Sequence, residues 1–166
     1  MKLAEAMKEK MLLSFELFPP KTEKGMENLP GTIEHLCKYK PEYISCTYGA
    51  GGGNVGANRE VCQMIKKAGP IPVTHFTVIR NTKEGIKEQL DQYLAEGVDH
   101  MLALRGDLPL GETTTCGDFD YATDLVKFCK RSIWRQIRNR SSRLSGRTYR
   151  MPQPGSGYFR FEAKAG

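Results

Sequence analysis

The hydrophobic positions along the first 130 residues follow two different spacings. Four short, nearly continuous apolar runs, each bounded by polar or turn-forming residues, predict β-strands. After each run, apolar residues recur three or four positions apart, which is typical of amphipathic helices. The predicted strands are residues 12–18, 42–48, 71–79 and 100–107.

Each predicted strand is followed by a predicted helix. Pro30 and Gly31 are expected to delay the start of the first helix or to bend it. Asn81, with Glu84 three residues later, is the predicted N-cap of the third helix, and Gly97 is expected to end that helix. Four strand–helix units with short connections predict an α/β fold with a parallel sheet covered by helices. The helical stripes are Leu29/Ile33/Leu36, Val61/Ile65, Ile86/Leu90/Leu94 and Tyr121/Leu125/Phe128.

The alternating pattern stops near residue 131, where the composition also changes. Residues 1–130 carry 16 basic and 18 acidic side chains, whereas residues 131–166 carry 9 basic side chains, 8 of them Arg, and 1 acidic one. The net charge of +6 therefore originates in the tail and not in the main segment. Because the main segment is slightly acidic, we do not expect it to bind nucleic acid.

The cysteines and the amino terminus indicate a cytoplasmic protein. The five cysteines are odd in number and form no C-x-x-C pair, which favours reduced thiols over a disulfide framework or a zinc site. The first eleven residues are charged throughout and do not resemble a signal peptide, and no stretch is long and apolar enough to cross a membrane. The cysteines are Cys37, Cys46, Cys62, Cys116 and Cys129.

Polar residues stand at the carboxyl end of every predicted strand: Glu16, 47–48, 75–77 and 105–107. Ligands of parallel α/β folds bind at that edge of the sheet, so these residues predict a binding site there. Each also has a simpler explanation. Glu16 fits a solvated or lysine-paired acid, His75 fits a hydrogen-bonded core residue, and residues 105–107 fit a structural ion pair.

The glycine loop after the second strand offers an alternative. Residues 51–56, GGGNVG, satisfy the G-x-G-x-x-G pattern between a strand and a helix. A dinucleotide-binding Rossmann unit would place an acid about 20 residues later, but the segment PVTHF holds none. The loop also lacks the Lys-Ser/Thr of a P-loop. A Rossmann-type nucleotide-binding module therefore remains one alternative, and a non-catalytic interaction protein with a basic tail remains another.

Five motifs together resemble one family, the methylenetetrahydrofolate reductases, which are flavoenzymes of one-carbon metabolism and methionine biosynthesis built on a (β/α)8 TIM barrel. The motifs occur in the family's order and at its approximate spacing, and the resemblance covers about residues 10–131. They are SFELFPPKT at 14–22, ISCTYGAGG at 44–52, THFT at 74–77, ALRGDLP at 103–109 and YATDLV at 121–126.

This resemblance implies a role for each matching residue. Glu16 matches the catalytic acid, and Thr47 matches a position that meets the nicotinamide. Asp107 matches a position that binds the flavin and also lies close to the folate. The cofactor is FAD, the hydride donor is NADH or NADPH, and the substrate is methylenetetrahydrofolate. The positions that match flavin-binding residues are Tyr48, Ala50, His75, Arg105, Gly106, Asp107 and Ala122.

The chemistry implied by the resemblance suits these residue types. A hydride passes from the nicotinamide to FAD and then to the one-carbon unit of the folate, whose ring must first be opened by protonation. A glutamate at the end of an apolar strand loses solvation of its charged form, so Glu16 is expected to hold the required proton. Arg105 is expected to supply positive charge to the cofactor, and Gly106 to permit close approach of the backbone.

The resemblance also implies that half of a barrel is missing. We divide the chain into a partial TIM-barrel reductase domain, 1–130, with about four of the eight units, and an irregular, arginine-rich tail, 131–166, that does not match. We interpret the tail as an out-of-frame or mis-spliced terminus. A true basic tail for nucleic acid or an acidic partner fits less well, because regularly spaced stacking aromatics are missing. A half barrel exposes sheet edges, so we expect dependence on association, including homo-oligomers.

Overall fold

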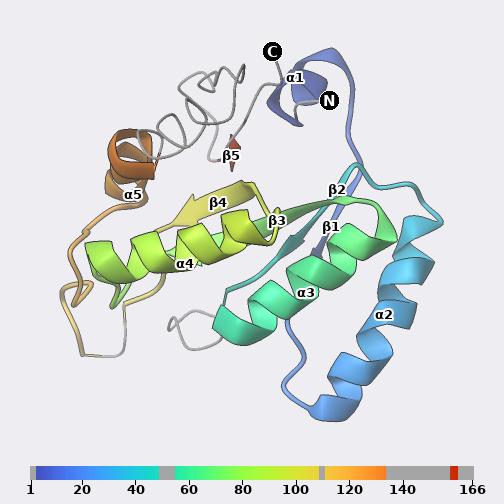
Figure 1. Cartoon of the computed structure of the whole chain (residues 1–166), viewed down its shortest axis with the longest axis horizontal. Coiled ribbons are helices and arrows are strands. Elements are labelled where there is room, and N and C mark those ends of the chain that lie inside the picture. Colours follow the sequence, from blue (N-terminus) through green and yellow to red (C-terminus); the bar gives the residue numbers. More distant parts are fainter. Residues whose placement is uncertain (1–2, 49–54, 109–110, 134–157, 161–166) are drawn as a thin grey trace.

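The computed structural model describes residues 3–48, 55–108, 111–133 and 158–160. Helices and strands alternate along the first three of these ranges, as the sequence pattern predicts (Figure 1). The strands are β1 (Ser14–Leu17), β2 (Tyr43–Cys46), β3 (Ile71–Thr77), β4 (His100–Leu104) and β5 (Tyr158–Arg160). The helices are α1 (Leu3–Glu9), α2 (Glu23–Cys37), α3 (Val55–Ala68), α4 (Lys83–Ala95) and α5 (Ala122–Phe128), which continues into the π-helical turn η1 (Cys129–Ile133).

The strands form one sheet in the order β1-β2-β3-β4-β5, and β1 to β4 are parallel. Their registers pair Glu16 with Ser45, Cys46 with Thr74 and Thr77 with Leu104. Four parallel strands that alternate with helices confirm the predicted α/β class and are consistent with the start of a TIM-barrel domain. Within the described residues the sheet is open, with β1 at one edge and β5 at the other.

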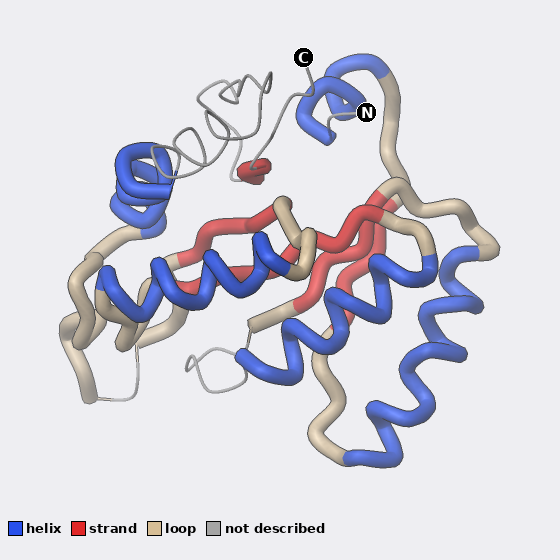
Figure 2. The backbone as a smooth tube through the Cα atoms, in the orientation of Figure 1, coloured by secondary structure: helices blue, strands red, loops and turns tan. Residues whose placement is uncertain are grey.

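The core lies between the sheet and the helices α2, α3 and α4, which cover one face of the sheet (Figure 2). All four residues of β2 are buried, and so are six of the seven residues of β3. Burial on both faces explains why these strands appear in the sequence as apolar runs without a polar alternation. The largest fully buried side chains are Ile33, Ile44, Tyr48, Ile65, Phe76, Ile79, Ile86, Leu90, Tyr93, Met101 and Leu125.

The N-cap of α4 differs from the sequence-based prediction. Thr82 and not Asn81 caps the helix, and its hydroxyl accepts a hydrogen bond from the backbone N–H of Gly85 at 3.1 Å. The side-chain amide of Asn81 instead donates to the carbonyl oxygens of Thr77 (3.0 Å) and Ile79 (3.2 Å). The prediction was wrong because Thr82, one residue later, also suits an N-cap, and the Asn81 side chain instead satisfies carbonyls after β3.

Of the two effects expected of Pro30 and Gly31 on α2, a delayed start does not occur and a bend stays a prediction, whereas the prediction for the end of α4 was correct. The α2 helix begins at Glu23, because the Thr22 hydroxyl caps it, and it runs through Pro30 without a delayed start. At the end of α4, Gly97 has a φ of 72° and donates its N–H to the carbonyl of Leu94. Glycine adopts this left-handed conformation without steric cost, so it is well suited to end the helix.

The tail is not irregular throughout, which corrects the prediction for residues 131–166. Residues 158–160 form β5, which pairs antiparallel with β4, with Arg160 opposite His100 and Tyr158 opposite Leu102. The outer edge of β4 would otherwise present unpaired backbone groups, and an extended segment of the same chain satisfies some of them. Residues 134–157 and 161–166 of the predicted tail lie outside the described ranges.

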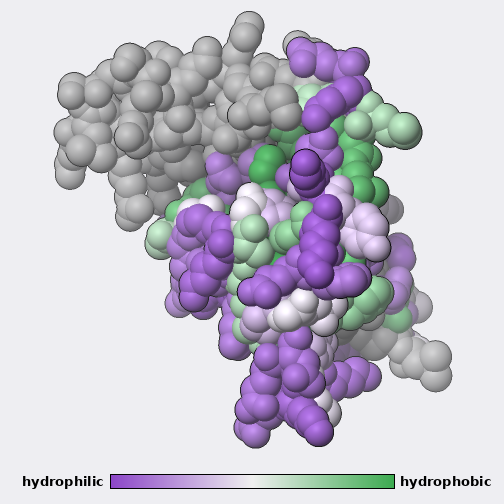
Figure 3. Space-filling view, turned by 90° about the vertical axis from the view of Figure 1, so that its right-hand side faces the viewer, coloured by the Kyte–Doolittle hydropathy of each residue, from purple (hydrophilic) through white to green (hydrophobic). Residues whose placement is uncertain are grey.

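The opposite edge of the sheet exposes apolar side chains. In the described part of the chain, no strand pairs with the outer side of β1. Close to this strand, the exposed fraction is 96% for Met11, 44% for Leu13 and 71% for Phe18. Viewed from the side that carries α2, hydrophobic residues reach the surface above the polar residues that cover the lower part of the molecule (Figure 3).

The helices of the described ranges are too short or too polar to span a bilayer.

The burial of β2, an inner strand of the sheet, leads to a prediction about stability. Ile44 is fully buried, so replacing it with alanine removes packed atoms and leaves a cavity. We expect Ile44→Ala to lower the free energy of unfolding by roughly 2–5 kcal/mol, measured by urea denaturation. Met11→Ala is the matched control, because its side chain is exposed, and we expect a change within about 0.5 kcal/mol. Equal effects of the two substitutions would contradict the described core.

Candidate functional site

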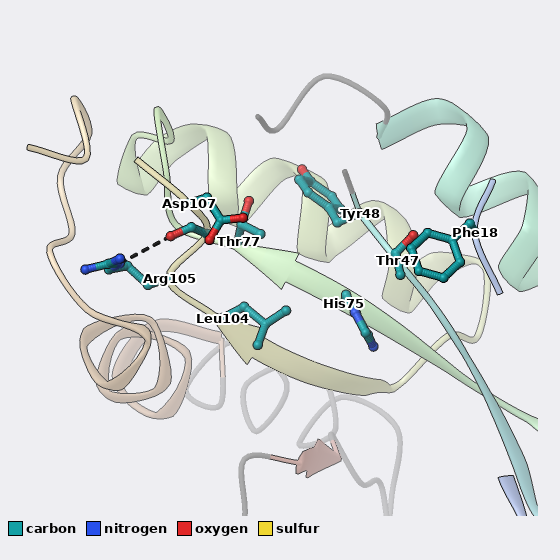
Figure 4. A pocket seen from close by; sticks show the side chains of 9 residues that line it. Phe18, Thr47, Tyr48, His75, Thr77, Leu104, Arg105 and Asp107 are labelled. Carbon is teal, nitrogen blue, oxygen red and sulfur yellow. Dashed lines mark hydrogen bonds between the residues drawn. The ribbon is translucent and has the colours of Figure 1, made fainter. Parts of the chain in front are cut away.

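A cavity of about 510 Å³ lies at the carboxyl ends of β2, β3 and β4 (Figure 4). The parallel strands bring these ends to one edge of the sheet, so residues far apart in sequence meet there. Its volume lies within the range of small-molecule sites, and its lining mixes apolar with charged residues. The lining residues are Phe18, Thr47, Tyr48, His75, Thr77, Leu104, Arg105, Gly106 and Asp107.

Six of the nine residues selected from the sequence line this cavity. Glu16 does not line it, but its carboxylate lies 3.8 Å from the ring nitrogen Nε2 of His75, which does. Ala122, the first residue of α5, is packed against the core and is not part of the lining. Ala50 lies outside the described residues, as do residues 49–54 of the glycine loop. The six lining residues are Thr47, Tyr48, His75, Arg105, Gly106 and Asp107.

Glu16 and His75 differ in their exposure to solvent. The side chain of Glu16 is 50% exposed, because β1 is the edge strand and no described strand pairs with its outer side. The expectation that Glu16 would be desolvated was therefore wrong for this structure. The side chain of His75 is only 9% exposed, and desolvation lowers its pKa, opposed in part by the negative charge of Glu16. Burial thus favours the neutral imidazole at the cavity wall.

Asn58 of α3 holds the carboxyl end of β2 in place. Its buried side-chain amide donates to the carbonyl oxygens of Cys46 (3.0 Å) and Thr47 (2.9 Å). Its side-chain oxygen accepts from the hydroxyls of Thr74 (2.8 Å) and Tyr93 (2.7 Å). One buried side chain therefore connects β2, β3, α3 and α4, and it binds the carbonyl of Thr47, a residue of the cavity wall. Such a fully satisfied network specifies the position of the backbone that precedes Tyr48.

Tyr48 is the large buried residue at this edge. Its hydroxyl donates to the side-chain oxygen of Gln89, and the Gln89 amide donates to that of Asn81 at 3.3 Å. Burial raises the pKa of Tyr48 to about 12, so the phenol stays protonated and remains a donor at neutral pH. Because the hydroxyl is hydrogen-bonded to Gln89 of α4, it is the aromatic ring of Tyr48 that faces the cavity. The ring also packs on Phe76, with 5.1 Å between the centroids.

The segment after β4 combines a positive and a negative side chain around a glycine. The Nε of Arg105 donates to the carbonyl of Gly106 at 3.2 Å (Figure 4), and no ion pair joins Arg105 to Asp107 in this described segment. Gly106 has a φ of 87°, and a Cβ added to it would lie 3.0 Å from Ile79 and 3.2 Å from Thr77. The position therefore requires glycine, and both charged side chains are available to a ligand.

Three lining residues were given no individual role from the sequence, although Thr77 belongs to the polar strand end 75–77 named there. Phe18 directly follows the first strand, Thr77 ends the third, and Leu104 ends the fourth. Each lies at the carboxyl end of a strand, where polar residues were sought in the sequence, and Thr77 belongs to the THFT motif. Hydroxyl or apolar character alone does not distinguish a lining residue from a core residue. The signal that could have found them is their position at a strand end.

Comparison with known proteins shows the family of this chain. A family model described as methylenetetrahydrofolate reductase matches residues 2–138. The chain belongs to the methylenetetrahydrofolate reductase family. It is 38% identical over 120 residues to the 5,10-methylenetetrahydrofolate reductase of Pectobacterium carotovorum and 36% identical over 120 residues to that of Escherichia coli. Each match covers 71% of this chain and 39% of the relative.

A plant relative extends the comparison. The Arabidopsis thaliana protein named methylenetetrahydrofolate reductase (NADH) 1 is 36% identical over 117 residues, which are 68% of this chain and 20% of that protein. This member of the reductase family therefore spans about two fifths of the length of its bacterial relatives. The five motifs quoted from the sequence all fall within the residues that the family model matches.

The Asn58 network predicts a large effect of a single substitution. Asn58→Ala would remove four hydrogen bonds, which join Asn58 to two hydroxyls and two carbonyls. We expect the free energy of unfolding to fall by roughly 2–4 kcal/mol, measured by urea denaturation. Asn28→Ala is the control, because Asn28 lies in α2 with its side chain exposed. A change of less than about 0.5 kcal/mol for Asn58→Ala would show that the network contributes little.

His75 predicts a specific dependence of stability on pH. The unfolded chain protonates His75 with the ordinary pKa of 6.5, whereas the folded chain protonates it only at lower pH. The unfolded state then binds more protons below pH 6.5, so stability is complete above this pH and falls as the pH decreases. We expect urea denaturation between pH 7.5 and about 5 to show a smaller loss in His75→Gln than in the native chain.

The control for this series is His35→Gln, because His35 lies on α2 and is exposed. This variant should reproduce the pH profile of the native chain. If His75→Gln also reproduced it, the buried imidazole would not be the source of the acid sensitivity.

Proposed function

We propose that this chain carries the flavin- and folate-binding edge of a methylenetetrahydrofolate reductase. The reaction is the reduction of 5,10-methylenetetrahydrofolate to 5-methyltetrahydrofolate in one-carbon metabolism and methionine biosynthesis in the cytoplasm. The observation that supports it is the cavity, which gathers Thr47, Tyr48, His75 and residues 105–107 from three strands, with Glu16 next to His75. The family match concerns the sequence alone, whereas the cavity shows that these side chains lie together in space. We assign this edge to a domain of residues 1–130.

The residues at this edge suit FAD. Gly106 packs so closely on Ile79 and Thr77 that no side chain fits there, so glycine fixes the position of the backbone that lines the cavity after β4. Arg105 and Asp107 do not neutralise each other, and together they offer a cation and an anion to polar ligand atoms. In our proposal Tyr48, Ala50, His75, Arg105, Gly106, Asp107 and Ala122 hold the flavin. When bound, FAD supplies the two-electron chemistry that connects the nicotinamide to the folate.

Glu16 is the proposed proton donor to the folate. Opening the folate ring requires a proton on a ring nitrogen, and a carboxylic acid beside the cavity can deliver it. The Glu16 carboxylate is half exposed and lies 3.8 Å from Nε2 of His75, which lines the cavity. Asp107 is the proposed contact to the folate, and Thr47 the proposed contact to the nicotinamide of NADH or NADPH.

The substitution Glu16→Gln tests this assignment. We expect the full chain to bind FAD, detected by titration of flavin fluorescence and visible absorbance. Glu16→Gln should bind FAD within about twofold of the native chain and oxidise NADH or NADPH with an artificial electron acceptor. Its reduction of methylenetetrahydrofolate should be about 100-fold slower or worse, because the general acid is missing.

Glu34→Gln is the matched control, because Glu34 is an exposed glutamate on α2. It should behave as the native chain in all three assays. Failure of the native chain to bind FAD would contradict the proposed function, whereas a fully active Glu16→Gln would contradict only the role of Glu16.

A further inference from the structure

The side chain of Thr77 has an unusual environment for a buried hydroxyl. The residue is 4% exposed at the end of β3, and in the described part of the chain its Oγ1 has no hydrogen-bond partner. The other buried threonines are satisfied. Thr74 donates to Asn58 at 2.8 Å, and Thr115 donates to the carbonyl of Phe119 at 2.6 Å. Buried polar atoms are nearly always paired, so the exception requires an explanation.

The position of Thr77 is determined by its neighbours. Its carbonyl accepts a hydrogen bond from the Asn81 amide at 3.0 Å, and its Cα pairs with Leu104 across the sheet. Gly106 packs against its Cβ, where an added methyl group would lie at 3.2 Å. These contacts fix the backbone of Thr77 and place the segment after β4 against its Cβ.

Thr77 itself lies in the wall of the cavity. Thr77 lines it together with Arg105 and Asp107, and Figure 4 shows it beside Asp107. His100 also has a buried ring nitrogen without a partner among the described residues, but it stands at the opposite end of β4 and does not line the cavity. Of these two unpartnered atoms, only that of Thr77 belongs to a residue that lines the cavity.

We propose that Thr77 is a ligand-binding residue of this site, whose hydroxyl forms a hydrogen bond with a polar atom of the flavin ring system. A hydroxyl both donates and accepts, so it can pair with a ring carbonyl or with a ring N–H. The unbound protein bears the cost of an unsatisfied buried group, and ligand binding removes that cost. This inference rests on the proposed function and adds a contact that neither the motifs nor the family match assigns.

The test compares Thr77→Val with Thr77→Ser in the full chain, with FAD as the probe. Valine keeps the shape of threonine and removes the hydroxyl, whereas serine keeps the hydroxyl. We expect Thr77→Val to weaken FAD binding about three- to tenfold and Thr77→Ser to stay within about twofold of the native chain. Without FAD, the melting temperature of Thr77→Val should equal or exceed that of the native chain, because no hydrogen bond is lost.

Thr74→Val is the matched control, because its hydroxyl already has a partner in Asn58. This control should lower the melting temperature without FAD, which is the opposite of the result expected for Thr77→Val. If Thr77→Val does not fold, Thr77→Ala serves for the same comparison with Thr77→Ser.

Two results would overturn the inference and leave the proposed function intact. One is native-like FAD binding by Thr77→Val, and the other is a clear loss of stability of that variant without FAD. Failure of the native chain to bind FAD would overturn the inference and the proposed function together.

Discussion

Parallel pairing of β1 to β4 brings four strand ends to one edge of the sheet, and the site depends on this pairing. The register places Glu16 opposite Ser45, Cys46 opposite Thr74 and Thr77 opposite Leu104. A shift by one residue in any pair would turn every following side chain to the other face of the sheet. Asn58 reinforces the register, because its hydrogen bonds join the end of β2 to β3 and α4.

The same arrangement gives the two titratable groups beside the cavity different environments. β3 is an inner strand, so His75 is buried and its neutral form is favoured. β1 is an edge strand, so Glu16 remains half exposed although it follows an apolar run in the sequence. The order of the strands thus decides how exposed the side chains of Glu16 and His75 are. His75 lies on a strand that has a neighbouring strand on each side, whereas Glu16 lies on a strand that has only one.

The order of helices and strands was predictable from the sequence because buried parallel strands and amphipathic helices have different apolar spacings. Local choices between equivalent residues were not predictable. Thr82 and Asn81 both suit an N-cap, and only the carbonyls left open after β3 show why Asn81 is used elsewhere. The strand at 158–160 was missed, because its place in the sheet depends on the open edge of β4 and not on its own spacing.

For the site, the sequence alone determined which residue types stand at the strand ends, and the motifs around Glu16, His75 and Asp107 indicated the reductase family before any geometry was known. Tertiary structure decided which of these side chains share a cavity, how exposed Glu16 is, and that the hydroxyl of Thr77 lacks a partner in the wall. The physical reason is that burial and hydrogen-bond pairing depend on neighbours from other strands, whereas residue type and spacing are local properties of the chain.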